Sequence, residues 1–282
     1  MAAFTNQATL TYNGNTTTSN ITVGEIVEVL SATKTPLVNT YTQDGRVTYT
    51  VSLINSGNTA FTDLTFSDNL GSYTSTTGDA VPLTYVTDSA KVYVNGVLAT
   101  PVTITGTNPL TITGITVPAN GNVLVVYETI ANEFAPPVTG GTINNTATFT
   151  SPALTNPVTA QATVTADTAP VLSISKTLSP TSVTENGQIT YTFIIQNRGN
   201  TATTAADNVV ITDTFNPILN PIAVTINGSQ ADPADYQYNA TTGLFQTNTG
   251  AITIPAATYT TNPDGSYAVT PGVTTVTVTG TV

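Results

Sequence analysis

The chain has 282 residues, enough for two domains of ordinary size, and it contains no Cys, His or Trp. Without Cys and His it can form no disulfide, and it has neither a thiolate nucleophile nor a His-based catalytic triad or zinc site. Its net charge of −11, with only five Lys and Arg residues, excludes the cationic surfaces that bind nucleic acid or anionic membranes. We therefore expect no metal, no cofactor and no nucleic-acid partner.

The N-terminal residues show no signal for membrane insertion. They contain neither the basic region nor the apolar region of a signal peptide, and no apolar run in the chain approaches the length of a membrane helix. We expect either that a leader is removed before residue 1 or that export does not use the usual secretory route.

Residues 6–11 (NQATLT) carry a strand pattern that recurs in mid-chain at residues 145–150 (NTATFT). A turn signal at Asn13-Gly14 and another strand-like run at residues 21–30 follow, so the element is either a single strand or a hairpin. Side chains on a strand alternate between its faces, and one face carries Phe4, Asn6, Ala8, Leu10 and Tyr12.

The rest of the chain contains two copies of one unit. The run at residues 30–35 (LSATKT) recurs at 172–177 (LSISKT), and GRVTYTVSLINSGNTA from Gly45 recurs as GQITYTFIIQNRGNTA from Gly187. Three extra residues in the second copy then make Asp213 the counterpart of Asp68. Near the end, the run from Val117 matches the run from Val269 without a gap, which places Gly280 opposite Glu128.

Short alternating runs separated by Asn-Gly and Asp-Gly turns are typical of half-buried strands in a β-sandwich. The sequence predicts an all-β chain with two tandem immunoglobulin-like sandwiches and an N-terminal donor strand or hairpin. The expected parts are a donor segment (1–20), a first sandwich (21–151), a linker or strand (152–170) and a second sandwich (171–282).

The second unit ends before its closing strand. The first unit continues into the strand at residues 145–150, whereas the second stops at Val282. If two chains were joined head to tail, Lys176 would precede the next Asn6 by 112 residues, and Lys34 precedes Asn145 by 111. The N-terminal segment therefore has the spacing of the second unit's missing strand, and we predict that this unit is incomplete without it.

The motifs L-S-x-x-K-T, G-x-x-T-Y-T and N-x-G-N-T-A, followed by a strand ending in Asp, recur in order in both units. In this the chain resembles the repeat called domain of unknown function eleven, found in large bacterial and archaeal surface proteins. The resemblance implies an immunoglobulin-like sandwich with an extracellular structural role, as in related adhesin and pilin modules. It does not imply catalysis on a substrate.

A sandwich that lacks a strand exposes unpaired backbone groups beside an apolar groove, and another strand can fill it. Donation to a neighbouring chain resembles the assembly of chaperone-usher pilins and would propagate as an open filament, because donor and acceptor lie at opposite ends. The alternative is self-complementation, in which residues 4–12 fold back onto the second domain of their own chain.

Two of the three lysines, Lys34 and Lys176, occupy the same repeat position inside runs that otherwise face a core. Burial lowers the pKa of a lysine towards the neutral, nucleophilic amine. Gram-positive pilins and adhesins of similar architecture use such a lysine to attack an asparagine amide, which releases ammonia and leaves an isopeptide bond. That resemblance implies Asn145 as the partner of Lys34, or Asn144 if the register slips, and Asn6 of the next subunit as the partner of Lys176.

The reaction also needs a carboxylic acid that polarises the amide and moves protons. Asp68 and Asp213 are the first candidates because they are equivalent in the two units, and Glu128 is a rival in the first unit. The alternative is that each lysine forms only a buried salt bridge with its aspartate, while the asparagines hydrogen-bond to turns.

The sequence thus favours a structural subunit of a self-assembling extracellular filament on a cell or spore surface. Its partners would be identical subunits, with a surface anchor or tip protein as a further partner, and its only chemistry would be single-turnover crosslinking. The alternative is a monomeric adhesin module that binds a host or carbohydrate ligand through its loops.

Overall fold

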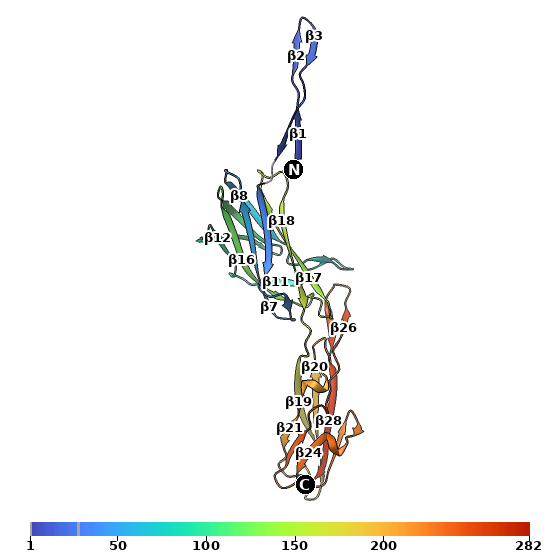
Figure 1. Cartoon of the computed structure of the whole chain (residues 1–282). Coiled ribbons are helices and arrows are strands. Elements are labelled where there is room, and N and C mark those ends of the chain that lie inside the picture. Colours follow the sequence, from blue (N-terminus) through green and yellow to red (C-terminus); the bar gives the residue numbers. More distant parts are fainter. Residues whose placement is uncertain (1, 27–28) are drawn as a thin grey trace.

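The computed structural model describes residues 2–26 and 29–282 and shows an elongated, almost entirely β molecule. An N-terminal hairpin, a first β-sandwich and a second β-sandwich follow one another along the long axis, and the C-terminus lies at the end opposite the hairpin (Figure 1). The helical elements of the described residues are two single 3-10 turns, Ala205–Asp207 and Pro233–Asp235. None of the helices described has the length or hydropathy of a membrane span.

The N-terminal hairpin projects away from the first sandwich (Figure 1). Strand β1 (Ala2–Asn6) pairs with β4 (Thr22–Ile26), and β2 (Thr9–Tyr12) pairs with β3 (Asn15–Thr18). Asn13 and Gly14 have φ values of 46° and 78°, the positive angles that a two-residue hairpin turn requires. The paired segment therefore continues past residue 20, the expected boundary, because β4 belongs to the hairpin and not to the first sandwich.

The first sandwich has two six-stranded sheets. The first sheet has the order β13-β12-β16-β7-β5, with β11 also beside β16, and the second has the order β14-β15-β8-β17-β18-β6. An arrangement in which β5, β7, β16 and β12 face β15, β8, β17 and β18 corresponds to an immunoglobulin-like sandwich. The strands are β5 (Leu30–Pro36), β6 (Thr40–Tyr41), β7 (Arg46–Asn55), β8 (Phe61–Asp68), β11 (Leu83–Tyr85), β12 (Lys91–Val94), β13 (Val97–Ala99), β14 (Thr103–Thr107), β15 (Leu110–Val117), β16 (Asn122–Ala131), β17 (Thr142–Thr150) and β18 (Val158–Ala166).

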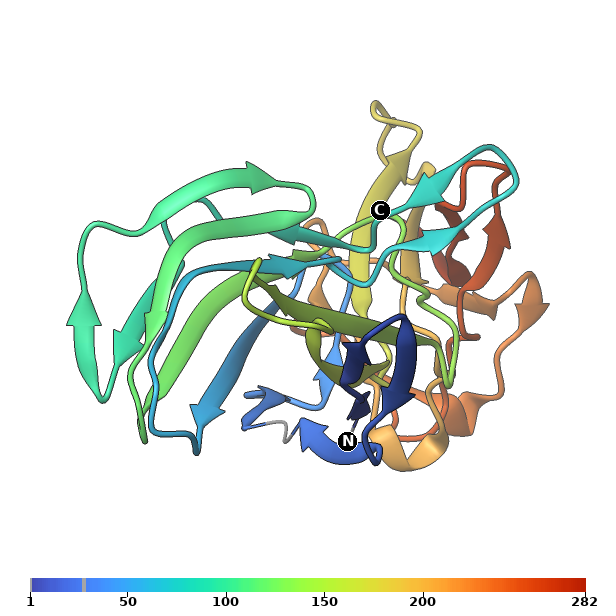
Figure 2. The same ribbon diagram turned by 90° about the horizontal axis from the view of Figure 1, so that it is seen from above.

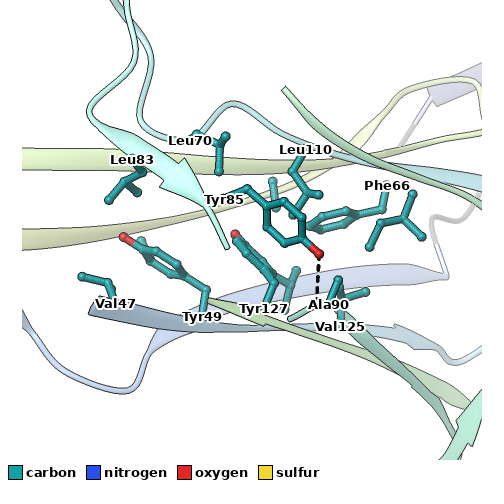
Figure 3. Close-up of a cluster of buried hydrophobic side chains, with 14 of the residues drawn as sticks. Val47, Tyr49, Phe66, Leu70, Leu83, Tyr85, Ala90, Leu110, Val125 and Tyr127 are labelled. Atoms are coloured by element: carbon teal, nitrogen blue, oxygen red, sulfur yellow. Dashed lines mark hydrogen bonds between the residues drawn. The ribbon is translucent and has the colours of Figure 1, made fainter. Parts of the chain in front are cut away.

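Aromatic side chains from both sheets fill the centre of the first sandwich (Figure 3). The ring centroids of Phe66 and Phe149 lie 5.3 Å apart, and those of Phe66 and Tyr127 lie 6.0 Å apart. Strand β18 contributes Val164 to the same core, so residues 158–166 of the segment expected as a linker or strand at 152–170 belong to the sandwich. Alternate residues of β18 are buried against the core, and residues 158–165 pair with β17.

The second sandwich has a five-stranded sheet, β19-β20-β28-β22-β23, that faces a three-stranded sheet, β21-β25-β24. Phe193, Phe215, Phe245, Val276 and Val278 lie at its buried centre. The strands are β19 (Leu172–Ser179), β20 (Gln188–Asn197), β21 (Thr212–Thr214), β22 (Ile222–Ile226), β23 (Ser229–Gln230), β24 (Tyr236–Asn239), β25 (Leu244–Thr247) and β28 (Gly272–Thr281).

Two hairpins bridge the sandwiches: β9 (Tyr73–Thr74) with β10 (Asp79–Ala80), and β26 (Thr258–Thr261) with β27 (Tyr267–Thr270). Figure 2 shows them side by side, β9 and β10 in cyan and β26 and β27 in red. The Tyr73 hydroxyl donates to the carbonyl of Gly265 at 2.9 Å, and the Tyr267 N–H donates to the carbonyl of Glu133 at 2.9 Å. These contacts hold the two sandwiches end to end.

The two sandwiches share their first sheet and differ in their second. Strand β8 pairs with β15 on one side and β17 on the other, whereas β21 pairs with β25 alone in the described part of the chain. The second sandwich therefore has no counterpart of β17 and β18 among the described residues. Strand pairing also corrects the repeat alignment: Glu128 lies opposite Thr48 and Thr279 lies opposite Thr190, so Glu128 corresponds to Thr279 and not to Gly280.

Candidate functional site

Lys34, Asp68 and Asn145 come from three strands and point into the core of the first sandwich. Lys34 lies on β5 of one sheet, while Asp68 at the end of β8 and Asn145 on β17 belong to the other. The Lys34 Nζ donates to Asp68 Oδ2 at 2.5 Å, and both side chains are fully buried. Asp68 Oδ1 accepts the backbone N–H of Leu70 at 3.0 Å, which fixes the orientation of the carboxylate.

Two tyrosines complete this cluster, and neither was predicted from the sequence as a site residue. Tyr127 Oη donates to Asp68 Oδ2 at 2.5 Å, and Lys34 Nζ lies 4.7 Å from the centre of the Tyr49 ring. The two rings stack at 5.7 Å and direct their hydroxyls to the same side (Figure 3). The signal for Tyr49 was its place in G-x-x-T-Y-T of both units, whereas Tyr127 has no counterpart.

Burial dominates the electrostatics of the cluster. It lowers the pKa of Lys34 to about 8, although the charge of Asp68 and its hydrogen bond favour the ammonium. Burial also raises the pKa of Tyr49 and of Tyr127, so both phenols remain protonated donors at neutral pH. The Asn145 amide lies close enough to both phenols to oppose this rise in their pKa, but it forms no hydrogen bond of normal geometry with either.

Asn145 is the most unusual member of the cluster. Its Nδ2 and Oδ1 are buried, and neither has a hydrogen-bond partner in the part of the chain that the structure describes. An unsatisfied buried polar group costs about 1–3 kcal/mol. The turn hydrogen bonds considered as an alternative role are therefore not made by Asn145. Asn144 points to the other face, where it accepts a hydrogen bond from Thr163 Oγ1 at 2.7 Å.

Glu128, the rival acid, does not join the cluster. It follows Tyr127 on β16, and the alternation of side chains along a strand places it on the outer face. There it accepts a hydrogen bond from Arg46 Nη1 at 2.5 Å, and the two side chains are 41% and 59% exposed. Asp68 is the carboxylate that contacts Lys34.

The equivalent cluster in the second sandwich is open to solvent. Lys176 forms an ion pair with Asp213, but its side chain is 40% exposed. Its Nζ lies 4.4 Å from the Tyr191 ring and 5.7 Å from the Phe215 ring. The position of Tyr127 is taken by Val278, since Val278 pairs with Tyr191 as Tyr127 pairs with Tyr49.

The strand that carries Lys176 is uncovered. Every residue of β19 is exposed, including Leu172, Ile174 and Leu178, which lie on the same face as Lys176. In the first sandwich, β18 packs beside the corresponding strand β5 and buries Lys34. The missing strands thus leave an apolar strip along β19, next to the unpaired edge of β21.

The N-terminal hairpin carries an apolar row with no partner in the described chain. Phe4, Leu10 and Tyr12 are 54%, 65% and 73% exposed, and Asn6 and Ala8 are also exposed. The Phe4 ring lies over Gly24 of the paired strand, where a larger residue would collide with it. The hairpin and the second sandwich lie at opposite ends of the molecule, so Asn6 is not brought to Lys176 of its own chain (Figure 1).

No protein-family model matches this chain, and no curated protein is similar to it. Among solved structures, BcpA, the major pilin subunit of Bacillus cereus, is similar at 12% identity with a TM-score of 0.38, covering 96% of this chain and 73% of the pilin. The major pilin SpaD of Corynebacterium diphtheriae is similar at 14% identity with a TM-score of 0.36, covering 85% of this chain and 58% of SpaD.

The N-terminal domain of the Streptococcus gordonii adhesin Sgo0707 is similar at 15% identity with a TM-score of 0.37. The match covers 54% of this chain and only 35% of that structure. Because all of these identities and TM-scores are low, the similarities assign the chain to no family.

Proposed function

We propose that the protein is the structural subunit of an extracellular filament, in which the N-terminal hairpin of one subunit completes the second sandwich of the next. The observation that carries this proposal lies within one chain: among the described residues the second sandwich has no counterpart of β17 and β18, and the hairpin offers two paired strands, the first of which carries the sequence pattern of β17. Such strand addition combines main-chain hydrogen bonds with side chains that fill alternate pockets.

The pairing in the first sandwich defines the register of the proposed joint. Ala147 and Phe149 of β17 lie opposite Asp68 and Phe66 of β8. Residues 145–150 correspond to residues 6–11, and residues 66–68 correspond to 211–213. The joint would therefore place Ala8 opposite Asp213 and Leu10 opposite Ile211, a buried residue at the unpaired edge.

The same register brings the hairpin's apolar row and Asn6 into the core of the receiving sandwich. Phe4 would occupy the position of Ile143, Asn6 that of Asn145, and Leu10 that of Phe149, all of which are buried in the first sandwich. Full burial of each apolar side chain contributes about 1.5–3 kcal/mol. The opposite row, which includes Thr9 and Thr11, would remain in solvent.

The connections between domains support a continuous fibre. Strand β18 of the first sandwich leads through five residues into β19 of the second. The hairpin strand β4 would be the corresponding last strand in the second sandwich of the preceding subunit, and it precedes β5 closely in the sequence. In joints within and between subunits, the last strand of one sandwich would then lie shortly before the first strand of the next along the chain. Each subunit would extend the fibre by binding its hairpin to the second sandwich of its neighbour.

Covalent reinforcement is the second part of the proposal. The neutral amine of Lys34 attacks Cγ of Asn145, a new C–N bond forms, the bond from Cγ to Nδ2 breaks, and Asp68 carries a proton from the amine to the departing ammonia. The net reaction joins an amine to an amide and loses one ammonia, about 17 Da, with the fold supplying the effective concentration. Lys176, Asp213 and Asn6 of the next subunit would repeat this chemistry across the joint.

The test is the size of the full chain compared with a variant that lacks residues 2–26, measured by sedimentation and electron microscopy. We expect filaments from the full chain and monomers from the truncated chain. Addition of truncated chains to full chains should shorten the filaments, because a truncated chain accepts a hairpin but donates none. A full chain that remains monomeric at high concentration would overturn the proposal and favour the adhesin alternative.

A further inference from the structure

We propose that Tyr49 is a further catalytic residue of the crosslinking reaction, and that Tyr191 has the same role in the second sandwich. The phenol donates a hydrogen bond to the asparagine Oδ1 while that oxygen becomes negatively charged. This inference rests on the proposed function, because the crosslink is part of it. It adds a residue that the three-residue scheme of lysine, asparagine and aspartate lacks.

Unpaired polar atoms gather at one place in the first sandwich. The buried side-chain polar atoms without a partner, within the described residues, are Tyr49 Oη and the two amide atoms of Asn145. Each costs about 1–3 kcal/mol, and a phenylalanine at position 49 would fill nearly the same space without that cost. The hydroxyl therefore does not serve the unreacted fold, and it lies in the cluster that holds the nucleophile and the amide.

The two phenols of the cluster have different surroundings. Tyr127 Oη is engaged with Asp68 at 2.5 Å, so it orients the acid. Among the described residues Tyr49 Oη has no hydrogen-bond partner, and the centre of its ring lies 4.7 Å from Nζ of the nucleophile Lys34. Tyr49 is thus the phenol available to the amide oxygen.

The repeat supports this distinction. Tyr191 occupies the position of Tyr49, and Lys176 lies 4.4 Å from its ring. Tyr127, in contrast, is replaced by Val278. The tyrosine that accompanies both lysines is the one in G-x-x-T-Y-T.

The chemistry requires such a donor. When the lysine nitrogen bonds to Cγ, the electron pair of the C=O bond moves to Oδ1, and it returns when the bond to Nδ2 breaks and ammonia leaves. A donor placed at this oxygen before the reaction stabilises the intermediate, and removal of one such donor typically slows a reaction about 10²–10³-fold. Because burial raises the pKa of Tyr49, its proton stays on the phenol and remains available for donation.

The rate can be measured with two full-length chains that form one covalent joint when mixed. The acceptor chain carries Asn6→Ala and keeps Lys176, while the donor chain carries Lys176→Ala and keeps Asn6. Denaturing electrophoresis then follows the covalent pair, and sedimentation follows assembly independently. We expect Tyr191→Phe in the acceptor to slow covalent pairing about 10²–10³-fold with assembly unchanged, and Tyr236→Phe, a matched loss of a phenol elsewhere in this sandwich, to have no effect.

Variants of Tyr49 in the first sandwich distinguish a catalytic role of the tyrosine from a purely structural one. In a Lys34→Met background, where no bond can form, Tyr49→Phe should not lower the denaturation midpoint, because the hydroxyl it removes is unpaired. With Lys34 present, Tyr49→Phe should delay the loss of about 17 Da in the intact mass. A lowered midpoint in the Lys34→Met background, or an unchanged rate in either sandwich, would overturn the inference.

Failure of the proposed function has a different signature. If chains assemble but never become covalently linked, the proposed crosslink and the role of the tyrosines are both contradicted, while the proposed filament is not. If chains do not assemble at all, the proposed filament is contradicted.

Discussion

Lys34 is held in an environment that favours its neutral form, yet it keeps a carboxylate in direct contact. Removal of one partner of such a buried pair leaves an uncompensated charge, which costs about 3–5 kcal/mol. Loss of either partner should therefore destabilise the first sandwich.

Replacement of Asp68 by Ala tests this sensitivity. We expect Asp68→Ala to retain the full sequence mass, because the proton carrier is lost, and to reduce the free energy of unfolding by about 3–5 kcal/mol. Intact mass and chemical denaturation measure the two effects. Glu128→Gln is the control: this exposed residue should leave the mass unchanged relative to wild type and alter stability by no more than about 1 kcal/mol.

The lowered pKa of Lys34 predicts that the free energy of unfolding depends on pH when Lys34 has not reacted, and that the proposed crosslink abolishes this dependence. In Asn145→Ala the lysine stays unreacted, and its pKa rises from about 8 in the folded chain to its ordinary 10.5 on unfolding. The unfolded chain then binds more protons between these values, so the free energy of unfolding should increase by about 2–3 kcal/mol from pH 8 to pH 10. Wild-type protein should lack this increase once Lys34 has formed the proposed amide.

The phenols of Tyr49 and Tyr127 set the upper pH limit of this increase in stability. Because burial raises the pKa of Tyr49 and Tyr127, both ionise first in the unfolded chain, and above about pH 10 they should lower stability in both proteins. A flat profile for Asn145→Ala between pH 8 and pH 10 would contradict the buried environment assigned to Lys34.

The sequence predicted those site residues that lie on the inward face of a strand, because they alternate along the chain with the apolar residues of the core. Lys34 contacts Asp68, and Asn145 is buried in the same sandwich, because each lies on the inward face of its strand. Glu128 was misjudged because a gapless alignment does not show which face of β16 it occupies. The roles of Tyr49 and Tyr127 depend on packing across the two sheets, which local patterns do not specify.

The apolar row of the hairpin and the apolar strip along β19 are both exposed in the part of the subunit that the structure describes. Exposed apolar side chains and an unpaired strand edge both favour association. Together they explain why the exposed row on the hairpin is apolar while its opposite face is rich in Thr.

Leu10→Asp should prevent assembly without affecting the fold of the subunit. Leu10 is 65% exposed in the free chain, so the substitution costs the subunit little, but in the joint it would bury an unpaired carboxylate beside Ile211. Light scattering should detect monomers instead of filaments. Thr11→Asp on the opposite face of the same strand is the control, because its counterpart Thr150 is exposed.

Filaments of Leu10→Asp that match wild type in length would show that this face of the hairpin does not enter the receiving sandwich. Loss of assembly in Thr11→Asp as well would indicate an effect of charge alone.

At the element scale, the Asn13-Gly14 turn and the alternating runs predicted the hairpin, although its end at β4 was not foreseen. The run at residues 21–30 reads as one strand in sequence, whereas the structure divides its described residues between β4 and β5. Similarly, Val158–Ala166 has the alternation of a strand, but its place beside β17 and β6 depends on tertiary pairing.

In the whole molecule we expect two classes of crosslink, one inside the first sandwich and one between subunits, with separate consequences. Lys176→Ala should still form filaments, because strand addition needs no covalent bond, but hot detergent should reduce them to single subunits. Lys34→Ala would remove the proposed bond inside the first sandwich, and the joints between its subunits should remain resistant to hot detergent. Denaturing electrophoresis distinguishes the two, and equal behaviour of both variants would contradict the assignment of Lys176 to the joint.

The most direct test of the shared sandwich uses the absence of cysteine from the chain. Leu10→Cys and Ile211→Cys are made in separate full-length chains, which are mixed and mildly oxidised. The register of the joint places these residues opposite each other, so we expect a disulfide between the two variants, while Thr11→Cys mixed with Ile211→Cys should give almost none. If Leu10→Cys and Ile211→Cys chains assemble without forming this disulfide, the hairpin does not complete the neighbour's second sandwich.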